Sequence, residues 1–388
     1  MNAEGARRRI PRTLHPIAWW VWAIALATAV SRTTNPLLLV IALAVLGFVV
    51  ANRRVEAPWS RGFRYYLLVA LLAIALRVVF RSVFASGVTP DDHILFRLPV
   101  IPLPHWYTGV HLGGPVSLEA TLSAATDGLR LGTMLCCIGA ANALANPKRA
   151  LRVLPGALYE AGVAVTVAIS VAPQLVDSLQ RVRRARRLRP GARKGLRAIA
   201  SIVIPVLEDA LDRSLMLARA MDGRGYGRHG TATGRSRRAA GALMLLGLLG
   251  LCAGAYGLLD GTAPRTLGTP AISVGVAASL AGLALGSRRV TRTAYRPDPW
   301  LSPEWAVAAT GIATAVMLYV TVGYDAGDLN PSYYPLHWPS FPLVPALAIL
   351  LGALPAVISP PPTGPRPKPP TRAVTPVPSA PDADLVPA

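Results

Sequence analysis

The sequence has few charged side chains, and few of those are acidic. Charged residues make up 15% of its 388 residues, below the roughly 25% of a typical soluble domain, while apolar residues reach 52%. The mean hydropathy of +0.42 is correspondingly high. Because the apolar residues are also gathered into long runs, this composition argues against a soluble domain. It predicts an all-α, polytopic membrane protein with about eight transmembrane helices.

The shortage of acidic residues leaves 19 Asp and Glu against 40 Lys and Arg, a formal net charge of +21. Such an excess also occurs in nucleic-acid-binding proteins, but here the positive charge is concentrated in loops between apolar spans. That distribution follows the positive-inside rule. We therefore expect no nucleic-acid partner, a location in a bacterial inner (plasma) membrane, and both termini in the cytoplasm.

Cysteine is scarce, and Cys136, Cys137 and Cys252 all lie inside apolar runs. This placement is typical of buried thiols and not of a disulfide framework or a metal site. The loop Ser86–Val116 contains acids and histidines, but their spacing fits no standard ligand pattern. We expect no metal and no cofactor, and interpret this loop as a re-entrant or lid segment on the outer side.

The sequence also lacks the common catalytic motifs. It has no Gly-x-x-x-x-Gly-Lys-Ser/Thr phosphate loop, no Gly-x-Ser-x-Gly elbow and no His-Glu-x-x-His zinc helix. The glycines at Gly223, Gly225 and Gly227 do not have dinucleotide-binding spacing. We therefore expect a chain that is not itself an enzyme and does not hydrolyse ATP on its own.

Alternating apolar and basic stretches divide the chain into five parts. A basic tail at 1–14 precedes N-terminal transmembrane helices at 15–144, and a basic module at 145–237 separates these from C-terminal transmembrane helices at 238–358. The Pro-rich segment 359–388 has little to bury and is expected to be a disordered cytoplasmic tail. A crossing needs roughly 20 residues, and the eight expected spans are His15–Val30, Pro36–Val50, Tyr65–Phe84, Leu118–Leu144, Ala239–Leu259, Ala271–Gly286, Trp305–Val322 and Phe341–Ile358.

Two charged residues lie well inside the fourth expected span, away from its ends. Asp127 and Arg130 are three residues apart, which puts them on one helical face. Charges within a span are costly and tend to face protein or water. They either form a polar contact between helices or with a partner, or lie at the membrane interface, and the sequence leaves both interpretations open.

Small residues recur four apart in the fifth and sixth expected spans. Gly250 and Gly254 form one such step, and Gly282 and Gly286 form another. Such steps let helix backbones approach closely. They predict close packing of these spans and carry no functional implication.

The stretch Gln174–Gly230 is polar and basic, although it lies between apolar segments. Asp209 and Arg213 are four apart, which suits a pair on a helix surface, and Pro205 should kink the helix. An apolar stripe at helical spacing occupies the other side, formed by Ile199, Ile202, Val203, Val206, Leu207, Ala210, Leu211, Ala218 and Met221. The pattern predicts an amphipathic cytoplasmic helix that lies against another surface.

Two basic motifs mark helix ends in this stretch. The first is Ala185-Arg186-Arg187, and the second is Gly223-Arg224-Gly225. They resemble the ends of the two cytoplasmic coupling helices in the transmembrane T component of energy-coupling factor (ECF) transporters, a family that includes the CbiQ-type cobalt proteins. In that family both motifs read Ala-Arg-Gly, so this chain has Arg for Gly in the first and Gly for Ala in the second. The segment Ala125–Leu131 also resembles a helix of the family, and the resemblance covers roughly Ser117–Gly227.

The resemblance implies a coupling subunit of an ABC-type importer that takes up a vitamin or a transition-metal ion. The implied partners are two ABC-type ATPase subunits, or one fused double ATPase, and a small substrate-binding membrane S component. Arg186 and Arg224 would each dock in one ATPase subunit. The other residues of the two motifs, Ala185, Arg187, Gly223 and Gly225, would contact the ATPase subunits with them. The supporting residues would be Arg184, Arg189, Asp222 and Tyr226. The S component would select the substrate.

Other interpretations remain open. The chain could be a polytopic membrane enzyme acting on lipid or cell-wall precursors, with Asp91, Asp92 and His93 of the outer loop as its site. A stand-alone secondary transporter would be expected to contain inverted repeats, and no clear repeat relates the two halves. The motif arginines could also serve only as topology signals.

Overall fold

The computed structural model describes residues 14–54, 62–84, 92–101, 112–153, 156–188, 196–226, 234–259, 265–287, 298–324, 326–334 and 336–361. About 81% of these residues are helical. The expected basic tail and most of the expected Pro-rich tail lie outside them. The chain divides into two compact units, one formed by residues 1–145 and 300–388 and the other by residues 146–299.

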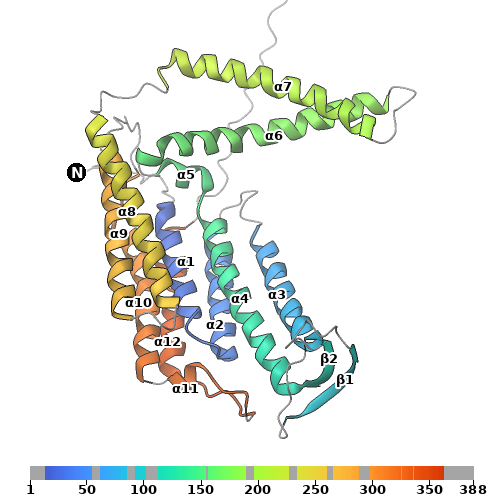
Figure 1. Cartoon of the computed structure of the whole chain (residues 1–388), viewed down its shortest axis with the longest axis vertical. Coiled ribbons are helices and arrows are strands. Elements are labelled where there is room, and N and C mark those ends of the chain that lie inside the picture. Colours follow the sequence, from blue (N-terminus) through green and yellow to red (C-terminus); the bar gives the residue numbers. More distant parts are fainter. Residues whose placement is uncertain are drawn as a thin grey trace, which may run out of the picture. The chain divides into compact units, whose positions relative to one another are not determined.

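The first unit is a helical bundle with one two-stranded sheet (Figure 1). Its elements are α1 (Pro16–Val30), α2 (Pro36–Arg53), α3 (Phe63–Val83), β1 (Ile94–Ile101), β2 (Leu112–Ser117), α4 (Leu118–Leu144), α10 (Ser302–Tyr324), α11 (Ala326–Leu329), α12 (Leu343–Leu351) and α13 (Pro355–Ile358). Helix α1 packs against α4 and α10, α2 packs against α4 and α12, and α3 packs against α4. Segments from the two ends of the chain therefore share one bundle.

Large apolar side chains fill the centre of this bundle. Trp22, Leu26 and Leu46 are fully buried. The Trp22 indole N–H donates a hydrogen bond of 3.1 Å to the Gly352 carbonyl, so the buried polar atom of this side chain is satisfied. A Cβ at Gly311 would lie 2.7 Å from the Trp22 Cα, which shows how closely α10 crosses α1.

The turn between α1 and α2 is the tight hairpin expected at Ser31–Asn35. Asn35 caps α2 by accepting a 3.0 Å hydrogen bond from the Leu37 N–H, and Pro36 occupies the first helical position. The Asn35 amide also donates to the Asp328 and Ser340 carbonyls, at 3.0 and 2.8 Å. The hairpin is thus fixed to the segment that follows α10.

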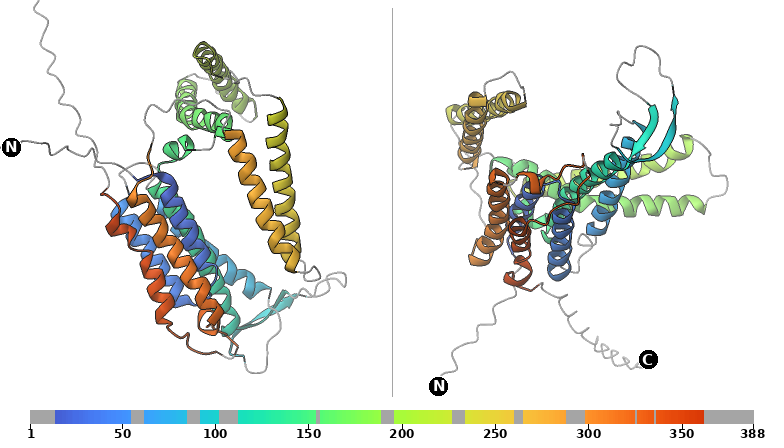
Figure 2. Two further views of the ribbon diagram at one scale, coloured as in Figure 1. Left: turned by 90° about the vertical axis from the view of Figure 1, so that its left-hand side faces the viewer. Right: turned by 90° about the horizontal axis from the view of Figure 1, so that it is seen from below.

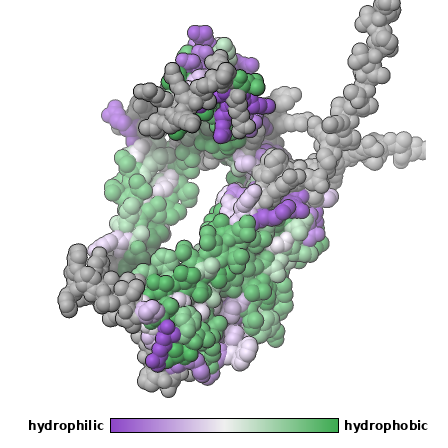
Figure 3. All heavy atoms as spheres, turned by 90° about the vertical axis from the view of Figure 1, so that its right-hand side faces the viewer, coloured by the Kyte–Doolittle hydropathy of each residue, from purple (hydrophilic) through white to green (hydrophobic). Residues whose placement is uncertain are grey.

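The outward faces of the bundle are apolar. Helix α3 has only one buried residue, Ala70, while Leu68 and Leu72 are more than 60% exposed. Figure 3, which views the molecule from the side of α3, shows hydrophobic side chains over most of this face. A helix that is hydrophobic all round suits a lipid environment, so the fold is that of a membrane-embedded protein.

Within the described residues, six helices are long and apolar enough to cross a membrane: α2, α3, α6, α8, α9 and α10. This agrees with the all-α membrane class but not with eight uninterrupted spans. Helix α1 has 15 residues, about 22 Å, which is shorter than a hydrocarbon core of about 30 Å. The expected last span is two short helices, α12 and α13, because Pro355 cannot continue a helix and instead starts the second one. Asp127 and Arg130 lower the hydropathy of α4.

The loop expected on the outer side contains secondary structure that the sequence did not predict. Strands β1 and β2 pair antiparallel with an irregular register, and β2 leads directly into α4. Ser117 caps α4 by accepting a 3.3 Å hydrogen bond from the Ala120 N–H. Asp91, His105 and His111 lie outside the described residues.

The second unit contains α5 (Pro147–Arg152), the short 3-10 helix η2 (Gly156–Leu158), α6 (Tyr159–Arg187), α7 (Leu196–Gly223), α8 (Gly234–Leu259) and α9 (Arg265–Ser287). Helices α8 and α9 lie side by side in every view (Figure 2). A Cβ at Gly250 would lie 2.9 Å from the Gly275 Cα. A Cβ at Gly254 would lie very close to the Ile272 side chain, and one at Gly282 would lie 2.9 Å from Met244 Cγ. The predicted close packing at these three glycines is confirmed.

Candidate functional site

The predicted coupling stretch forms two long helices that run side by side in opposite directions (Figure 1). The cross-contacts have the register of an antiparallel pair: Arg213 reaches Gln174 at 3.3 Å, and Arg181 lies 3.5 Å from Asp209. The C-terminal ends of α6 and α7 therefore lie at opposite ends of the pair. Helix α7 has 28 residues, which corresponds to a length of about 42 Å.

A polar cluster joins the two helices near their middle. Arg213 Nε donates to Asp209 Oδ1 at 2.9 Å, which confirms the predicted pair four residues apart. The Arg213 guanidinium, and next the hydroxyl of the buried Ser178 on α6, hold the pKa of Asp209 below its usual value. Since the cluster contains groups from both helices, it fixes their register.

The predicted apolar stripe of α7 is partly covered and partly exposed. Ile202 and Val206 are partly covered and share a helical face with Asp209 and Arg213, the residues that contact α6. The expectation that these two charged residues lie on the side opposite the stripe is therefore wrong, because they follow Val206 by three and seven residues. Val203, Leu207 and Leu211 are each at least 50% exposed. The described part of the second unit thus leaves half of this stripe uncovered.

The second motif forms a well-defined helix end. The Gly225 N–H donates to the Asp222 carbonyl at 2.8 Å, and the Tyr226 N–H donates to the Met221 carbonyl at 3.0 Å. These are the two hydrogen bonds of a Schellman motif, with Gly225 in the left-handed region at a φ of 75°. Gly225 is therefore the residue that lets α7 end here.

This cap places Arg224 at the C-cap position of α7, where its side chain is exposed. A positive charge at this end of a helix is favoured by the helix dipole. Gly223 and Asp222 are also exposed, a Cβ at Gly223 would meet no atom within 4 Å, and Tyr226 is 46% exposed. The motif presents an accessible guanidinium on a hydrogen-bonded helix end.

The first motif lies in the last turn of α6, which ends at Arg187. Ala185 is exposed, and Arg186 is half-buried with an interaction of its own. The Arg184 Nε is 3.4 Å from the Gln180 carbonyl, a long hydrogen bond within the same helix. The Arg187 side chain and Arg189 lie outside the described residues.

Asp127 and Arg130 are not part of this helix pair. The Arg130 guanidinium donates to the Ser31 carbonyl and so links α4 to the C-terminal end of α1. Asp127 lines a groove between α3 and α4. Arg130 thus makes a polar contact between helices, one of the two interpretations that the sequence left open.

Of the residues of the enzyme interpretation, His93 is positioned by Glu119, which the sequence did not single out. His93 Nδ1 lies 2.7 Å from Glu119 Oε1, and the His93 N–H donates to Oε2 at 3.1 Å. The Glu119 side chain is 3% exposed, in the first turn of α4, while that of His93 is 74% exposed. These contacts attach the start of β1 to α4. Asp92 also lies there, and the described residues contain no group of three metal-ligating side chains.

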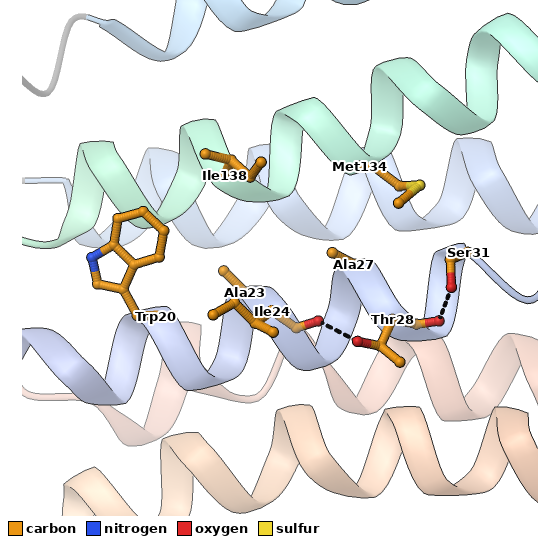
Figure 4. A pocket seen from close by; sticks show the side chains of 8 residues that line it. All are labelled: Trp20, Ala23, Ile24, Ala27, Thr28, Ser31, Met134 and Ile138. Carbon is orange, nitrogen blue, oxygen red and sulfur yellow. Dashed lines mark hydrogen bonds between the residues drawn. The ribbon is translucent and has the colours of Figure 1, made fainter. Parts of the chain in front are cut away.

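A groove of about 240 Å³ lies between α1 and α4, and Figure 4 shows its walls. Most of its lining side chains are apolar: it is formed by Trp20, Ala23, Ile24, Ala27, Thr28, Ser31, Met134 and Ile138. The Thr28 hydroxyl donates to the Ile24 carbonyl at 2.9 Å, and the Ser31 hydroxyl donates to the Thr28 carbonyl at 2.7 Å. Both hydroxyl groups already donate hydrogen bonds to backbone carbonyls of α1. The groove therefore suits an apolar group better than a polar ligand.

Comparison with protein-family models and with curated proteins finds no match for this chain. The candidate site is therefore defined by the geometry of the chain's own residues. That geometry consists of an accessible arginine on a glycine-capped helix end, and a second arginine motif at the opposite end of an antiparallel helix pair.

The cap predicts different outcomes for its two glycines. Gly225→Ala is expected to destabilise the end of α7 by about 1–2 kcal/mol, because alanine is strained at a positive φ. Gly223→Ala is expected to stabilise it by up to about 1 kcal/mol, since the position is helical and open. Amide hydrogen exchange at Arg224–Tyr226 should be faster in the first variant and unchanged or slower in the second. Equal exchange in both variants would show that Gly225 does not hold this cap.

Proposed function

We propose that the chain is the coupling subunit, the T component, of an ECF-type importer. In this role it transmits the motion of ABC-type ATPases to a separate substrate-binding membrane subunit. The observation that carries the proposal is the exposed Arg224 on the capped end of α7, at the opposite end of the helix pair from Ala185-Arg186-Arg187. Two motifs at opposite ends suit a partner that has two equivalent docking sites.

The chemistry of the motif fits such docking. A guanidinium keeps its charge and offers a planar set of donors, so Arg224 can enter an acidic or carbonyl-lined groove on an ATPase subunit. The absence of a side chain at Gly223 leaves room for the partner to approach α7. Closure of an ATPase dimer would then move the two docked ends relative to each other, and the polar cluster around Asp209 would transmit this motion through both helices.

The proposal requires α6 and α7 to lie on the cytoplasmic side, although α6 is long and apolar enough to cross a membrane. Two features support the cytoplasmic placement. Asp209 and Arg213 of α7 contact Gln174 and Arg181 of α6, so a buried α6 would draw these charges into the bilayer. Basic residues also flank α6 on both sides, and a crossing would put one of the two clusters outside.

In this proposal the protein belongs to a bacterial inner membrane, with both termini in the cytoplasm. The uncovered half of the α7 stripe, including Leu207 and Leu211, would contact a partner subunit or the membrane surface. The cargo would be a vitamin or a transition-metal ion, and the S component would select it.

The test is purification of the tagged chain from its native membrane, followed by mass spectrometry and activity assays. We expect two ABC-type ATPases, or one fused double ATPase, to co-purify with a small hydrophobic membrane protein. The chain alone is expected to hydrolyse no ATP, because it lacks a phosphate loop. Robust hydrolysis by the isolated chain, or transport by it alone in proteoliposomes, would refute the proposal.

A further inference from the structure

A second groove, of about 440 Å³, lies between α3 and α4 in the first unit. Its size is within the range of small-molecule sites. The lining residues come from the last two turns of α3 and the first half of α4, and they are Arg77, Phe80, Arg81, Phe84, Ser123, Ala124 and Asp127. The proposed coupling function uses none of them.

The charges in the groove favour an anion. Arg77 and Arg81 are one helical turn apart on α3, while Asp127 is the single acidic residue of the lining, so the described walls have a net charge of +1. Asp127 and Arg77 form no ion pair in the described part of the chain, whereas Arg81 makes an interaction of its own. Two guanidinium groups on one face match the oxygens of a phosphate, which they can bind through paired hydrogen bonds.

The apolar residues of the groove favour an amphiphile. The rings of Phe80 and Phe84 are stacked, with centroids 5.7 Å apart and planes at 21°. Along the same helix, Leu72, Leu76 and Val79 are more than half exposed, as expected of a surface that contacts acyl chains. Arg77 and Arg81 lie in the last two turns of α3, a helix long and apolar enough to cross a membrane. The ends of such a helix are where lipid headgroups are expected.

We propose that this groove binds the phosphate group of an anionic lipid. Arg77 and Arg81 hold the phosphate oxygens, and Ser123 offers a hydroxyl from α4. Phe80, Phe84 and the apolar face of α3 pack against the acyl chains. The inference stands independently of the proposed coupling function.

Arginines near helix ends also reach the headgroup region without forming a specific site. Arg64, an exposed residue in the first turn of α3, provides a matched control for that behaviour. Asp127 provides a test of opposite sign, because removing its charge raises the net charge of the groove. A specific site must respond to changes at Arg77, Arg81 and Asp127 but not to a change at Arg64.

The test titrates the purified full chain, in a neutral detergent, with phosphatidylglycerol and measures binding by native mass spectrometry. Arg77→Gln and Arg81→Gln are each expected to weaken binding about tenfold, Arg64→Gln to leave it unchanged, and Asp127→Asn to strengthen it. Phosphatidylcholine, which has no net charge, should bind more weakly than phosphatidylglycerol. Thermal unfolding of each variant identifies those that misfold. Arg77→Lys or Arg81→Lys then replaces a misfolded glutamine variant, and is expected to reduce lipid binding by a smaller factor.

Two results would overturn the proposal. If Arg64→Gln weakens lipid binding as much as the groove variants do, the arginines interact only with bulk headgroups. If inorganic phosphate binds as tightly as phosphatidylglycerol and displaces it, the groove is a site for free phosphate and the lipid assignment fails. Neither result affects the coupling proposal, whose residues lie on α6 and α7.

Discussion

Arg224→Ala is expected to weaken assembly with the ATPase partners by about 2–5 kcal/mol, the usual effect of truncating one partner of a buried charge pair. Arg224 is exposed in the described chain, so docking would remove its guanidinium from water and bring it against acidic or carbonyl groups. Co-purification of the ATPases should fall, and hydrolysis in any remaining complex should no longer drive transport. Arg224→Lys should restore only part of the loss, because lysine lacks the planar guanidinium.

Arg219→Ala is the matched control for this prediction. Arg219 is exposed on the same helix about one and a half turns earlier, outside the capped end. Its removal tests the effect of losing one positive charge from α7 without changing the motif. If Arg219→Ala and Arg224→Ala weaken assembly and transport equally, the arginines act as general positive charge and the docking role of Arg224 is wrong.

The largest effect of a substitution on stability is expected at Gly128, where α4 packs against α3. A Cβ at Gly128 would lie 2.6 Å from the Ile74 Cα, a backbone atom that cannot rotate away. Gly128→Leu should therefore push α3 from α4 and destabilise the first unit by about 1–3 kcal/mol or more. The thermal unfolding midpoint of the purified protein in detergent should fall, and so should its yield from the membrane.

Gly47 on α2 offers the same substitution without the collision, because a Cβ there would meet no atom within 4 Å. Gly47→Leu carries the same gain in helix propensity and the same added volume. It is expected to leave the midpoint unchanged or raise it slightly. A fall of equal size in both variants would mean that the close approach at Gly128 does not limit stability.

Local sequence pattern was sufficient to locate most of the helices. The expected span Leu118–Leu144 matches α4, and α3 and α10 differ from their expected spans by three residues or fewer at each end. These boundaries depend on caps and apolar runs, which are properties of neighbouring residues. The pair Asp209–Arg213 was predictable for the same reason, because both residues belong to one helix.

Local pattern did not predict the membrane spans correctly where both the hydropathy and the length of a helix decide whether it can cross. The segment Phe341–Ile358 has the apolar content of a span, yet Pro355 divides it into two short helices. The apolar half of α6 was too short to cross by itself, but the complete helix is long enough. Composition gives an average over a window, whereas a crossing depends on where the helix begins and ends.

The sequence by itself determined the membrane class, the positions of most helices, and the residues of the two arginine motifs, because each depends on local composition or spacing. Only the tertiary structure decided which distant residues meet. Asn35 donates to carbonyls 293 and 305 residues away, Glu119 holds His93, and Arg130 reaches the end of α1. It also decided that α6 and α7 pair in opposite directions, which separates the motif ends. Such contacts are decided by the folding of the whole chain, since burial and hydrogen bonding between distant segments leave no periodic signal in either segment alone.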